Sequence, residues 1–333
     1  MNATPDFLSD LKNAKAYAHP VQEIKLIETH ISWVFLTGDF VYKIKKPVQF
    51  SFLDYSTLDK RKFFCQEELR LNQCLSPDLY LGLSAIVKTS EGYQISDNVS
   101  NAVEFCVKMK QLPEEKRLNH LLEQKQVSKE DVEQIAQVLA DFHSKAKIIS
   151  DPEYSKPEKI LSEINDIMNV GPVVEKEFSL TSVLDYVLKK CAKFSFNHAD
   201  YFTERFNQNK IRECHGDLHS ANIFLIEGKP WIFDCIEFNK DFQYIDVASD
   251  VAFMAMDLDA FGREDLSAHF VSKYLEFSQD LDLKKMLDFY KCYKANVRAK
   301  IAAFEFMQTN SSEARERIRK YIRLCERYSE RLV

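Results

Sequence analysis

Apolar residues recur along the chain with two different periods, and the change between them divides the sequence. From residue 22 to residue 109, short apolar runs are separated by turns such as Thr37-Gly38-Asp39, which is typical of strands. Residues 59–75 carry a helical pattern, and residues 5–17 are expected to form a short amphipathic helix. Residues 1–109 are therefore expected to form mainly a small antiparallel sheet with one helix.

Beyond residue 110 the apolar period is that of helices. Ser128 and Asp131 have the spacing of a capping box and predict a helix start. Further helices are expected over residues 158–169, 180–206, 244–258, 265–278, 283–308 and 312–331, and two short strands over 222–226 and 230–234. This order differs from the strand–helix alternation of a doubly wound sheet.

Composition narrows the class of protein. The chain has 333 residues, 45% of them hydrophobic, and a net charge of −6, which gives no basic footprint for nucleic acid. Its eight cysteines form no CxxC pair and are expected to be reduced thiols of a cytoplasmic protein. No apolar signal core opens the chain, and no apolar run is long enough for a membrane helix.

The most specific motif is Cys214-His215-Gly216-Asp217-Leu218-His219-Ser220-Ala221-Asn222. It places Asn222 five residues after Asp217, and Asp234 follows twelve residues later at the end of an apolar run. Phosphoryl transfer needs such groups: a carboxylate that orients the attacking hydroxyl, and amide and carboxylate oxygens that hold Mg²⁺ on nucleotide phosphates. The spacing of Asp217 and Asn222 matches that of a kinase catalytic loop.

Lys43 ends an apolar run and matches the lysine that reaches nucleotide phosphates in kinases. A glutamate on the following helix normally holds that lysine in place. Of Glu67 and Glu68, Glu67 lies nearer the middle of the apolar arc, so it is expected to point inward and pair with Lys43. The alternative is that Lys43 is a solvated charge at a strand end.

Several segments together resemble an uncharacterised bacterial branch of the aminoglycoside phosphotransferase and protein-kinase-like family. They are GDFVYKIKKPVQFSFLDYSTLDKRKFFCQEELRLN, EFCVKMKQLP, HGDLHSANIF, IFDCIEFN and YKANVRAKIAAF, and they span most of the chain. In some relatives a Walker-type kinase domain follows this module, and we expect the present sequence to lack that domain.

The resemblance implies an α+β, bilobal protein-kinase-like fold. A small antiparallel β-sheet N-lobe with one helix, residues 1–109, would bind the nucleotide. A mainly helical C-lobe, residues 110–333, would carry the catalytic loop, the metal loop and the substrate site.

The resemblance also implies a Mg²⁺-dependent phosphotransferase that moves the γ-phosphate of ATP or GTP to a hydroxyl of a small molecule. Asp217 would orient that hydroxyl, and Asn222 and Asp234 would be the Mg²⁺ ligands. The carbonyl of Lys110 and the amide of Leu112 would hydrogen-bond the adenine edge.

Two alternatives to this function remain open. Protein kinases cover the phosphates with a glycine-rich loop, whereas Glu28-Thr29-His30 separates the first two strands here. A nucleotide-binding pseudokinase acting as an interaction module is therefore one alternative. A protein kinase is the other, although no long activation loop follows Asp234.

Some residues near these motifs allow two interpretations. Asp246 is expected to cap a helix. Arg298 and Lys300 either line the substrate side or face water. The acidic residues Asp257, Asp259, Glu264 and Asp265 either hold a cationic substrate or form a surface loop.

Overall fold

The computed structural model describes residues 5–332 and divides into two compact units. The first, called here the sheet unit, runs to Arg117 and takes in Trp231–Lys240 as well. The second, the helical unit, comprises Leu118–Pro230 and the chain from Asp241 onward. The predicted division after residue 109 differs from this one, because residues 110–117 and the segment around Asp234 belong to the sheet unit.

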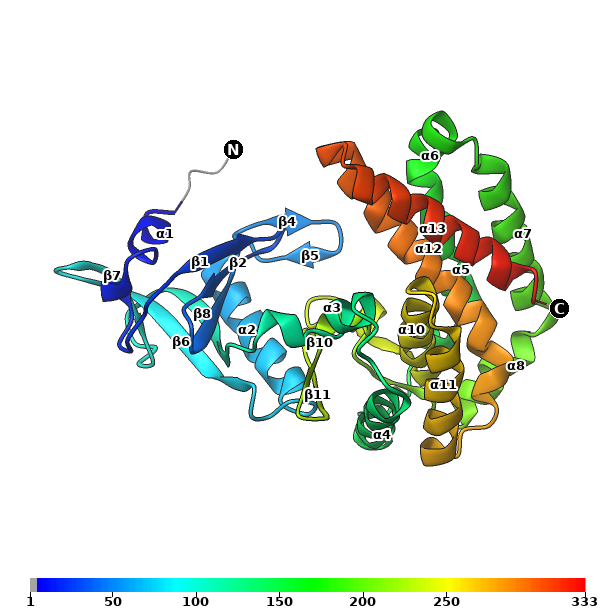
Figure 1. The fold of residues 1–333 in the computed structure, drawn as a ribbon, viewed down its shortest axis with the longest axis horizontal. Helices are drawn as coiled ribbons and strands as arrows, with labels where there is room; N and C mark the ends of the chain where they lie inside the picture. The colour runs from blue at the N-terminus through cyan, green and yellow to red at the C-terminus, as the bar shows by residue number, and fades with distance from the viewer. Residues whose placement is uncertain (1–4, 333) are drawn as a thin grey trace. The chain divides into compact units, whose positions relative to one another are not determined.

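The sheet unit is built on one antiparallel sheet of six strands in the order β1-β2-β3-β8-β6-β7 (Figure 1). The strands are β1 (Lys25–Glu28), β2 (Ser32–Leu36), β3 (Phe40–Lys45), β6 (Tyr80–Thr89), β7 (Gly92–Ser96) and β8 (Ala102–Lys110). Two short strands, β4 (Gln49–Phe50) and β5 (Leu53–Asp54), pair with each other before α2 (Leu58–Asn72). The helix α2 packs against β6 and β8.

Both faces of this sheet are buried, and the two-residue period of β3 explains which side chains reach each face. Tyr42 and Ile44 pack into a core with Phe7 and Leu11, contributed by the segment that holds α1 (Phe7–Asp10) and the 3-10 turn Ala14–Ala16. The predicted helix over residues 5–17 is therefore shorter and broken. Alternate residues of β3, including Lys43, lie on the opposite face of the sheet, the face that α2 covers.

The helical unit follows the predicted order with small shifts of bounds. Its helices are α3 (Leu118–Glu123), α4 (Lys129–Lys145), α5 (Pro157–Asn165), α6 (Gly171–Phe178), α7 (Thr181–Asn197), α8 (Ala199–Asn207), α10 (Val247–Ala260), α11 (Glu264–Ser278), α12 (Leu283–Thr309) and α13 (Ser312–Ser329). The capping box of Ser128 and Asp131 is present at the start of α4. The helices α3 and α6 were not predicted, and the single helix expected over residues 180–206 is divided into α7 and α8. Helix α6 begins at Gly171-Pro172, where proline in the first turn is compatible with a helix start.

Short elements connect these helices. They are the 3-10 turns Glu114–Lys116, Pro152–Ser155, Asp166–Val170 and Ser220–Asn222, the strands β9 (Ile211–Glu213), β10 (Ile223–Ile226), β11 (Lys229–Ile232) and β12 (Tyr244–Asp246), and the single-turn helix α9 (Lys240–Gln243). β9 pairs with β12, while β10 and β11 are the strands of a hairpin. The unit boundary falls within β11.

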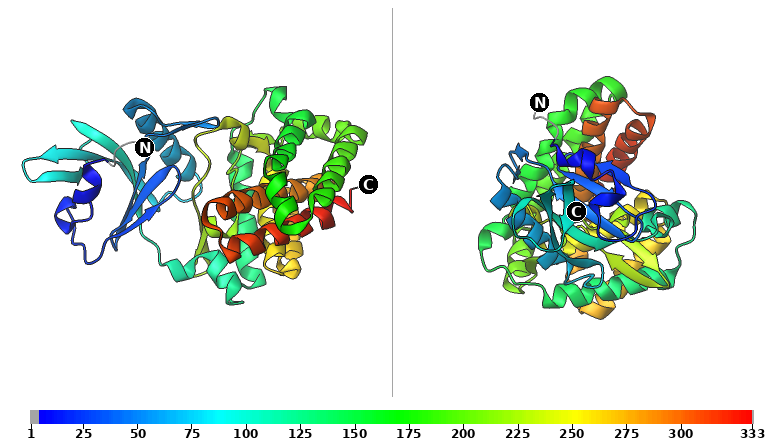
Figure 2. Two further views of the ribbon diagram at one scale, coloured as in Figure 1. Left: turned by 90° about the horizontal axis from the view of Figure 1, so that it is seen from above. Right: turned by 90° about the vertical axis from the view of Figure 1, so that its left-hand side faces the viewer.

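Helix α10 is the most deeply buried element of the helical unit. Every residue from Val247 to Asp259 is buried. It contacts both α11 and α12, and α12 and α13 run side by side in both views of Figure 2. Because such a helix is fixed on all sides, polar side chains on it can hold neighbouring loops in one position.

Two further findings concern membrane-spanning helices and the cysteines. Within residues 5–332, no helix is long and apolar enough to cross a membrane. The eight cysteines are all free thiols, and seven of them are buried.

Candidate active site

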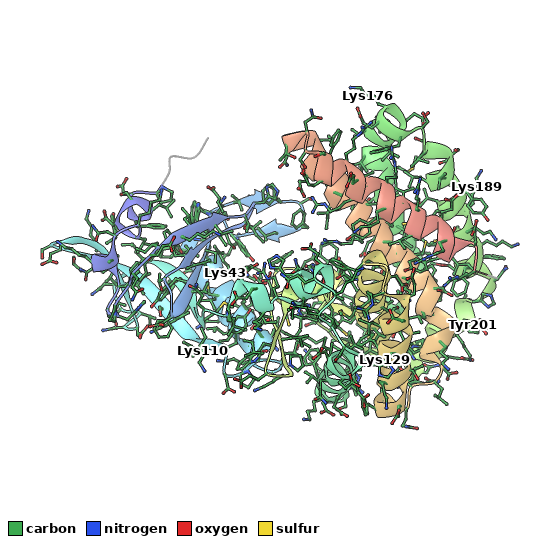
Figure 3. The ribbon with its side chains drawn as sticks, viewed as in Figure 1. Lys43, Lys110, Lys129, Lys176, Lys189 and Tyr201 are labelled. Atoms are coloured by element: carbon green, nitrogen blue, oxygen red, sulfur yellow. The ribbon has the colours of Figure 1, made fainter. Side chains whose placement is uncertain are left out.

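Lys43 projects from β3 in the sheet unit (Figure 3) and lies between two carboxylates. Its Nζ is 2.9 Å from Oε1 of Glu68 on α2 and 2.5 Å from Oδ1 of Asp234. Burial alone would lower the pKa of Lys43, but Asp234 and Glu68 raise it well above its usual range. Lys43 is therefore a fixed positive charge, as binding of phosphate oxygens requires.

The prediction that Glu67 points inward and pairs with Lys43 is wrong. Glu67 is half-buried and pairs with Arg70 one turn along α2, at 2.9 Å, whereas Glu68 is fully buried. The apolar arc used for the prediction was misleading because Phe63, one of its members, is 53% exposed.

A second lysine on the same face of β3 completes the ion-pair network. Lys45 is buried, and its Nζ is 2.7 Å from Oε2 of Glu68 and also contacts Glu237. The Tyr55 hydroxyl donates to the same Glu237 carboxylate at 2.6 Å. Burial would raise the pKa of Glu68, but Lys43 and Lys45 lower it to about 2. The two-residue period of β3 was the sequence signal for Lys45, because it places residues 43 and 45 on one face.

The segment that carries Asp234 is held by side chains of the sheet unit. The Asp234 amide donates to the Tyr80 hydroxyl at 3.1 Å, and the Cys235 amide donates to Oδ1 of Asn72 at 2.9 Å. The Ser76 hydroxyl donates to the carbonyl of Ile232 at 2.8 Å. Asp234 adopts φ +67°, an uncommon conformation for a residue other than glycine, which these neighbouring contacts fix.

The expected adenine-binding segment ends β8. The Lys110 amide donates to the carbonyl of Leu79, and the next amide, of Gln111, donates to the carbonyl of Asp39, both at 2.9 Å. The Leu112 amide makes no backbone hydrogen bond within the part of the chain that the structure describes. The Leu112 side chain packs, with Trp231 and Phe233, against the core between the sheet and α2.

The turn between β1 and β2 is closed by its own side chain instead of by glycine. Oγ1 of Thr29 accepts the amides of Ile31 and Ser32, at 3.3 and 2.9 Å, and Lys46 binds the Thr29 carbonyl at 2.5 Å. These amides are thus already hydrogen-bonded. As the sequence indicated, this turn is not a glycine-rich loop. In such a loop, free backbone amides would cover the nucleotide phosphates.

In the helical unit, Asp250 of α10 fixes the start of the Cys214–Asn222 loop. Its two carboxylate oxygens accept the amides of His215 and Gly216, at 2.7 and 2.9 Å. Gly216 has φ +85°, which a residue with a side chain rarely adopts, and its carbonyl accepts from Lys294 at 3.2 Å. Asp246, as predicted, caps α10 by accepting the amide of Ala248 at 2.9 Å.

Asp250 also belongs to the one group of metal-type donors found in the described residues, His143, Cys214 and Asp250. His143 contacts the Tyr274 hydroxyl at 2.8 Å and Asp250 at 3.3 Å. Since Asp250 already accepts two loop amides, we interpret this group as a hydrogen-bonded support of the loop.

Asp217 and Asn222 are brought together within this loop. Nδ2 of Asn222 donates to the Asp217 carbonyl at 3.0 Å and to its Oδ2 at 3.3 Å. Nε2 of His219 lies 3.3 Å from the same carboxylate. Burial would raise the pKa of Asp217, but His219 and then Arg298 hold it below its usual range. The Asp217 side chain is therefore a carboxylate that can accept a proton or orient a hydroxyl.

Part of the acidic group is buried rather than forming a surface loop. Asp257 accepts the Ser220 amide at 2.8 Å, and Asp259 pairs with Lys291 at 2.9 Å, so both are structural groups of α10. The structure also separates the two candidate cations of α12. Arg298 lines a cavity beside the loop, whereas Lys300 lies 3.7 Å from Asp166.

Solved structures with the same fold are small-molecule phosphotransferases. A choline/ethanolamine kinase family protein from Mesorhizobium loti has a TM-score of 0.54 at 10% identity, over 94% of this chain and 89% of its own. Choline kinase from Cryptosporidium parvum has a TM-score of 0.54 at 10% identity, over 93% of this chain and 90% of its own. The GDP complex of aminoglycoside 2'-phosphotransferase-IIIa gives 0.50 at 13%, over 94% of each chain.

The chain therefore shares the fold of these aminoglycoside phosphotransferase and choline/ethanolamine kinase structures. The predicted fold class is confirmed, with an antiparallel sheet unit and a mainly helical unit.

Two mycobacterial proteins are similar to this chain over most of its length. The uncharacterized proteins Rv2004c of Mycobacterium tuberculosis and Mb2027c of Mycobacterium bovis are each 31% identical to this chain over 312 residues. These residues are 92% of this chain, which spans about 60% of the length of each relative. No model of a known protein family matches the chain.

Proposed function

We propose that this protein is a phosphotransferase that moves the γ-phosphate of ATP or GTP to a hydroxyl of a small molecule. The observation that carries the proposal is the Lys43–Glu68 pair beside Asp234, on a chain whose catalytic-loop motif holds Asp217 and Asn222. The fold adds support, since the similar structures are kinases of small hydroxyl compounds by name, and one was solved with GDP. We also propose the cytoplasm as its location, from the free thiols.

Lys43 would hold the nucleotide phosphates. Its charge is kept by the neighbouring carboxylates of Asp234 and Glu68, and Glu68 is too deeply buried to reach a ligand itself. Glu68 thus replaces Glu67 as the residue that positions the lysine. The Lys110 carbonyl and the Leu112 amide are proposed to contact the base, because Leu112 has an amide that no backbone group takes up.

Asp234 and Asn222 are proposed as Mg²⁺ ligands, and their donor atoms fit a hard cation that prefers oxygen. One oxygen of Asp234 contacts Lys43 while 42% of its side chain is exposed, so an oxygen is available. The amide nitrogen of Asn222 is committed to Asp217, which leaves its oxygen for a cation. Bound Mg²⁺ would neutralise charge on the phosphates during transfer.

Asp217 is proposed to orient the acceptor hydroxyl and to take its proton. Its lowered pKa keeps it ionised at neutral pH, and the amides of the two residues before it, His215 and Gly216, are held by Asp250. A carboxylate of this kind contributes mainly by positioning, because the transferred phosphoryl group itself needs little proton chemistry.

The Asp217→Asn variant tests this assignment. It should lose turnover by about 10²–10⁴-fold while still binding Mg²⁺-nucleotide, because the variant removes the proton acceptor and leaves the phosphate-binding groups. The measurement is phosphate transfer from ATP and GTP across a panel of hydroxyl compounds, with nucleotide affinity measured in parallel. Asp185→Asn, an exposed position on α7, is the matched control. Wild-type turnover in Asp217→Asn would show that the catalytic assignment is wrong.

A further inference from the structure

A cavity of about 810 Å³ opens within the helical unit beside the catalytic loop. His219, Ser220 and Ala221 of the loop line it, together with residues of α10, α12 and α13. Its volume lies in the range of sites for small organic ligands. Because His219 contacts Asp217 at 3.3 Å, a molecule held here lies near the carboxylate proposed to act on the acceptor.

Two cations of this cavity have no carboxylate partner. Arg298 of α12 lies 3.5 Å from Nε2 of His219, and its buried Nε has no hydrogen-bond partner in the described chain. Lys320 of α13 rests over the rings of Phe261 and Tyr321, at 5.5 and 5.2 Å. Neither makes an ion pair within residues 5–332, although most buried cations in proteins are paired.

These two cations repel each other. Burial lowers the pKa of Lys320, and Arg298 and Arg317 lower it further, against the opposing effect of Asp257. Arg317 is itself paired with Glu305 at 2.5 Å. An anion between Arg298 and Lys320 would relieve this repulsion and supply the missing hydrogen-bond acceptors.

The cavity is also lined by acidic residues, and their charges must be weighed against the two cations. By number they exceed the cations, which on its own would favour a cationic ligand. However, Glu123, Glu313 and Glu316 are exposed, so water and salt screen their charges. Asp257 is buried but already accepts the Ser220 amide. Among the buried and half-buried charges of the cavity that make no ion pair in the described chain, the one carboxylate of Asp257 stands against the two cations Arg298 and Lys320.

We propose that the acceptor of this enzyme carries an anionic group, a carboxylate or a phosphate, that binds between Arg298 and Lys320 while its hydroxyl faces Asp217. The substrate class is thus a small hydroxy acid or a phosphorylated polyol, and this inference rests on the function proposed above. It sets the chain apart from enzymes that hold cationic acceptors.

The test measures ligand binding by titration calorimetry, without nucleotide. The probes are glycerate and glycerol phosphate as the two anion types, glycerol as the neutral compound, and choline as the cation. Wild-type protein should bind at least one anionic probe, and bind it more tightly than glycerol or choline. Arg298→Gln and Lys320→Gln should each weaken it about ten-fold or more, as expected for loss of a charged hydrogen-bond donor.

Arg323→Gln is the matched control. Arg323 is exposed on the same helix as Lys320 and lines a neighbouring cavity instead, so its loss should leave binding unchanged. If Arg298→Gln fails to fold, Lys320→Gln decides, because Lys320 is only half-buried. Tighter binding of choline than of either anion, or unchanged binding in the two variants, would overturn the inference.

Nucleotide binding is measured on the same samples to separate this inference from the proposed function. If wild-type protein binds Mg²⁺-nucleotide but none of the anionic probes, the anion site is refuted and the proposed function is retained. Anion binding without nucleotide binding refutes the phosphotransferase and retains the anion site.

Discussion

Glu68 is the carboxylate that links both lysines of β3 in the sheet unit. It is buried, and each of its carboxylate oxygens contacts one lysine of β3. Removing one partner of a buried ion pair leaves the other charge unpaired in a place where water cannot reach it. Glu68 therefore stabilises the unit as well as positioning Lys43.

The comparison of Glu68→Gln with Glu67→Gln tests this role. Glu68→Gln should lower the free energy of unfolding by about 3 kcal/mol, because two buried lysines each lose one of their two carboxylate partners. Glu67→Gln should change it by less than about 0.5 kcal/mol, since Glu67 forms only a surface pair with Arg70. Urea unfolding of the three proteins measures both values.

The stabilisation that Glu68 provides should also depend on pH. The pKa of Glu68 is lowered from 4.5 to about 2, so its stabilisation is full above about pH 5 and falls as the carboxylate is protonated on acidification. The difference in unfolding free energy between wild type and Glu68→Gln should shrink from about pH 5 toward about pH 3. A constant difference across this range would refute the assigned ion pairs.

The sequence was enough to pair Asp217 with Asn222, but not to choose between Glu67 and Glu68. Asp217 and Asn222 were found because their spacing in one loop determines their contact. Choosing between Glu67 and Glu68 required the orientation of α2 about its own axis. That orientation depends on packing against β6 and β8, which the periodicity of a single helix does not reveal.

At the scale of elements, α10 connects the core of the helical unit to the Cys214–Asn222 loop. Asp250 holds the loop amides and Asp257 holds the Ser220 amide, one on each side of Asp217 in the sequence. The loop therefore takes its conformation from a buried helix rather than from its own composition, apart from Gly216.

The Asp250→Asn variant tests this arrangement. Asparagine offers one acceptor where the loop presents two amides, so one amide loses its partner and the unfolding free energy should fall by about 1–3 kcal/mol. The turnover number should also fall at least about ten-fold, while the KM for nucleotide changes less than about three-fold.

Asp265→Asn is the control for that experiment, because Asp265 is an exposed residue of α11 paired with Arg263. A purely structural role for Asp250 would lower stability and leave the turnover number of the folded protein unchanged. That result would contradict a positioning role.

Most helices and strands were predictable because their apolar patterns are long and regular, as in α12 and β8. The short helix α6 and the broken segment at residues 7–16 were not, since neither has enough turns to produce a clear period. The division of the chain was missed for a different reason. Trp231–Lys240 joins the sheet unit through hydrogen bonds to Asn72, Ser76 and Tyr80, contacts between residues 154 to 163 apart in the sequence.

At the scale of the whole molecule, the proposed function requires both the lysine network of the sheet unit and the Cys214–Asn222 loop of the helical unit. The fold is that of known small-molecule kinases, and the chain spans about 60% of the length of its mycobacterial relatives. The claim on which the rest depends is that this molecule binds a nucleotide with Mg²⁺ through Lys43 and Asp234.

Thermal unfolding with ATP and with GTP, each with and without Mg²⁺, tests that claim most directly. At a nucleotide concentration about 100 times Kd, wild-type protein should gain about 2.7 kcal/mol of stability, only when Mg²⁺ is present. The Asp234→Ala variant, compared with its own unliganded form, should lose this gain. Absence of a Mg²⁺-dependent gain in wild type, or an equal gain in Asp234→Ala, would contradict the account.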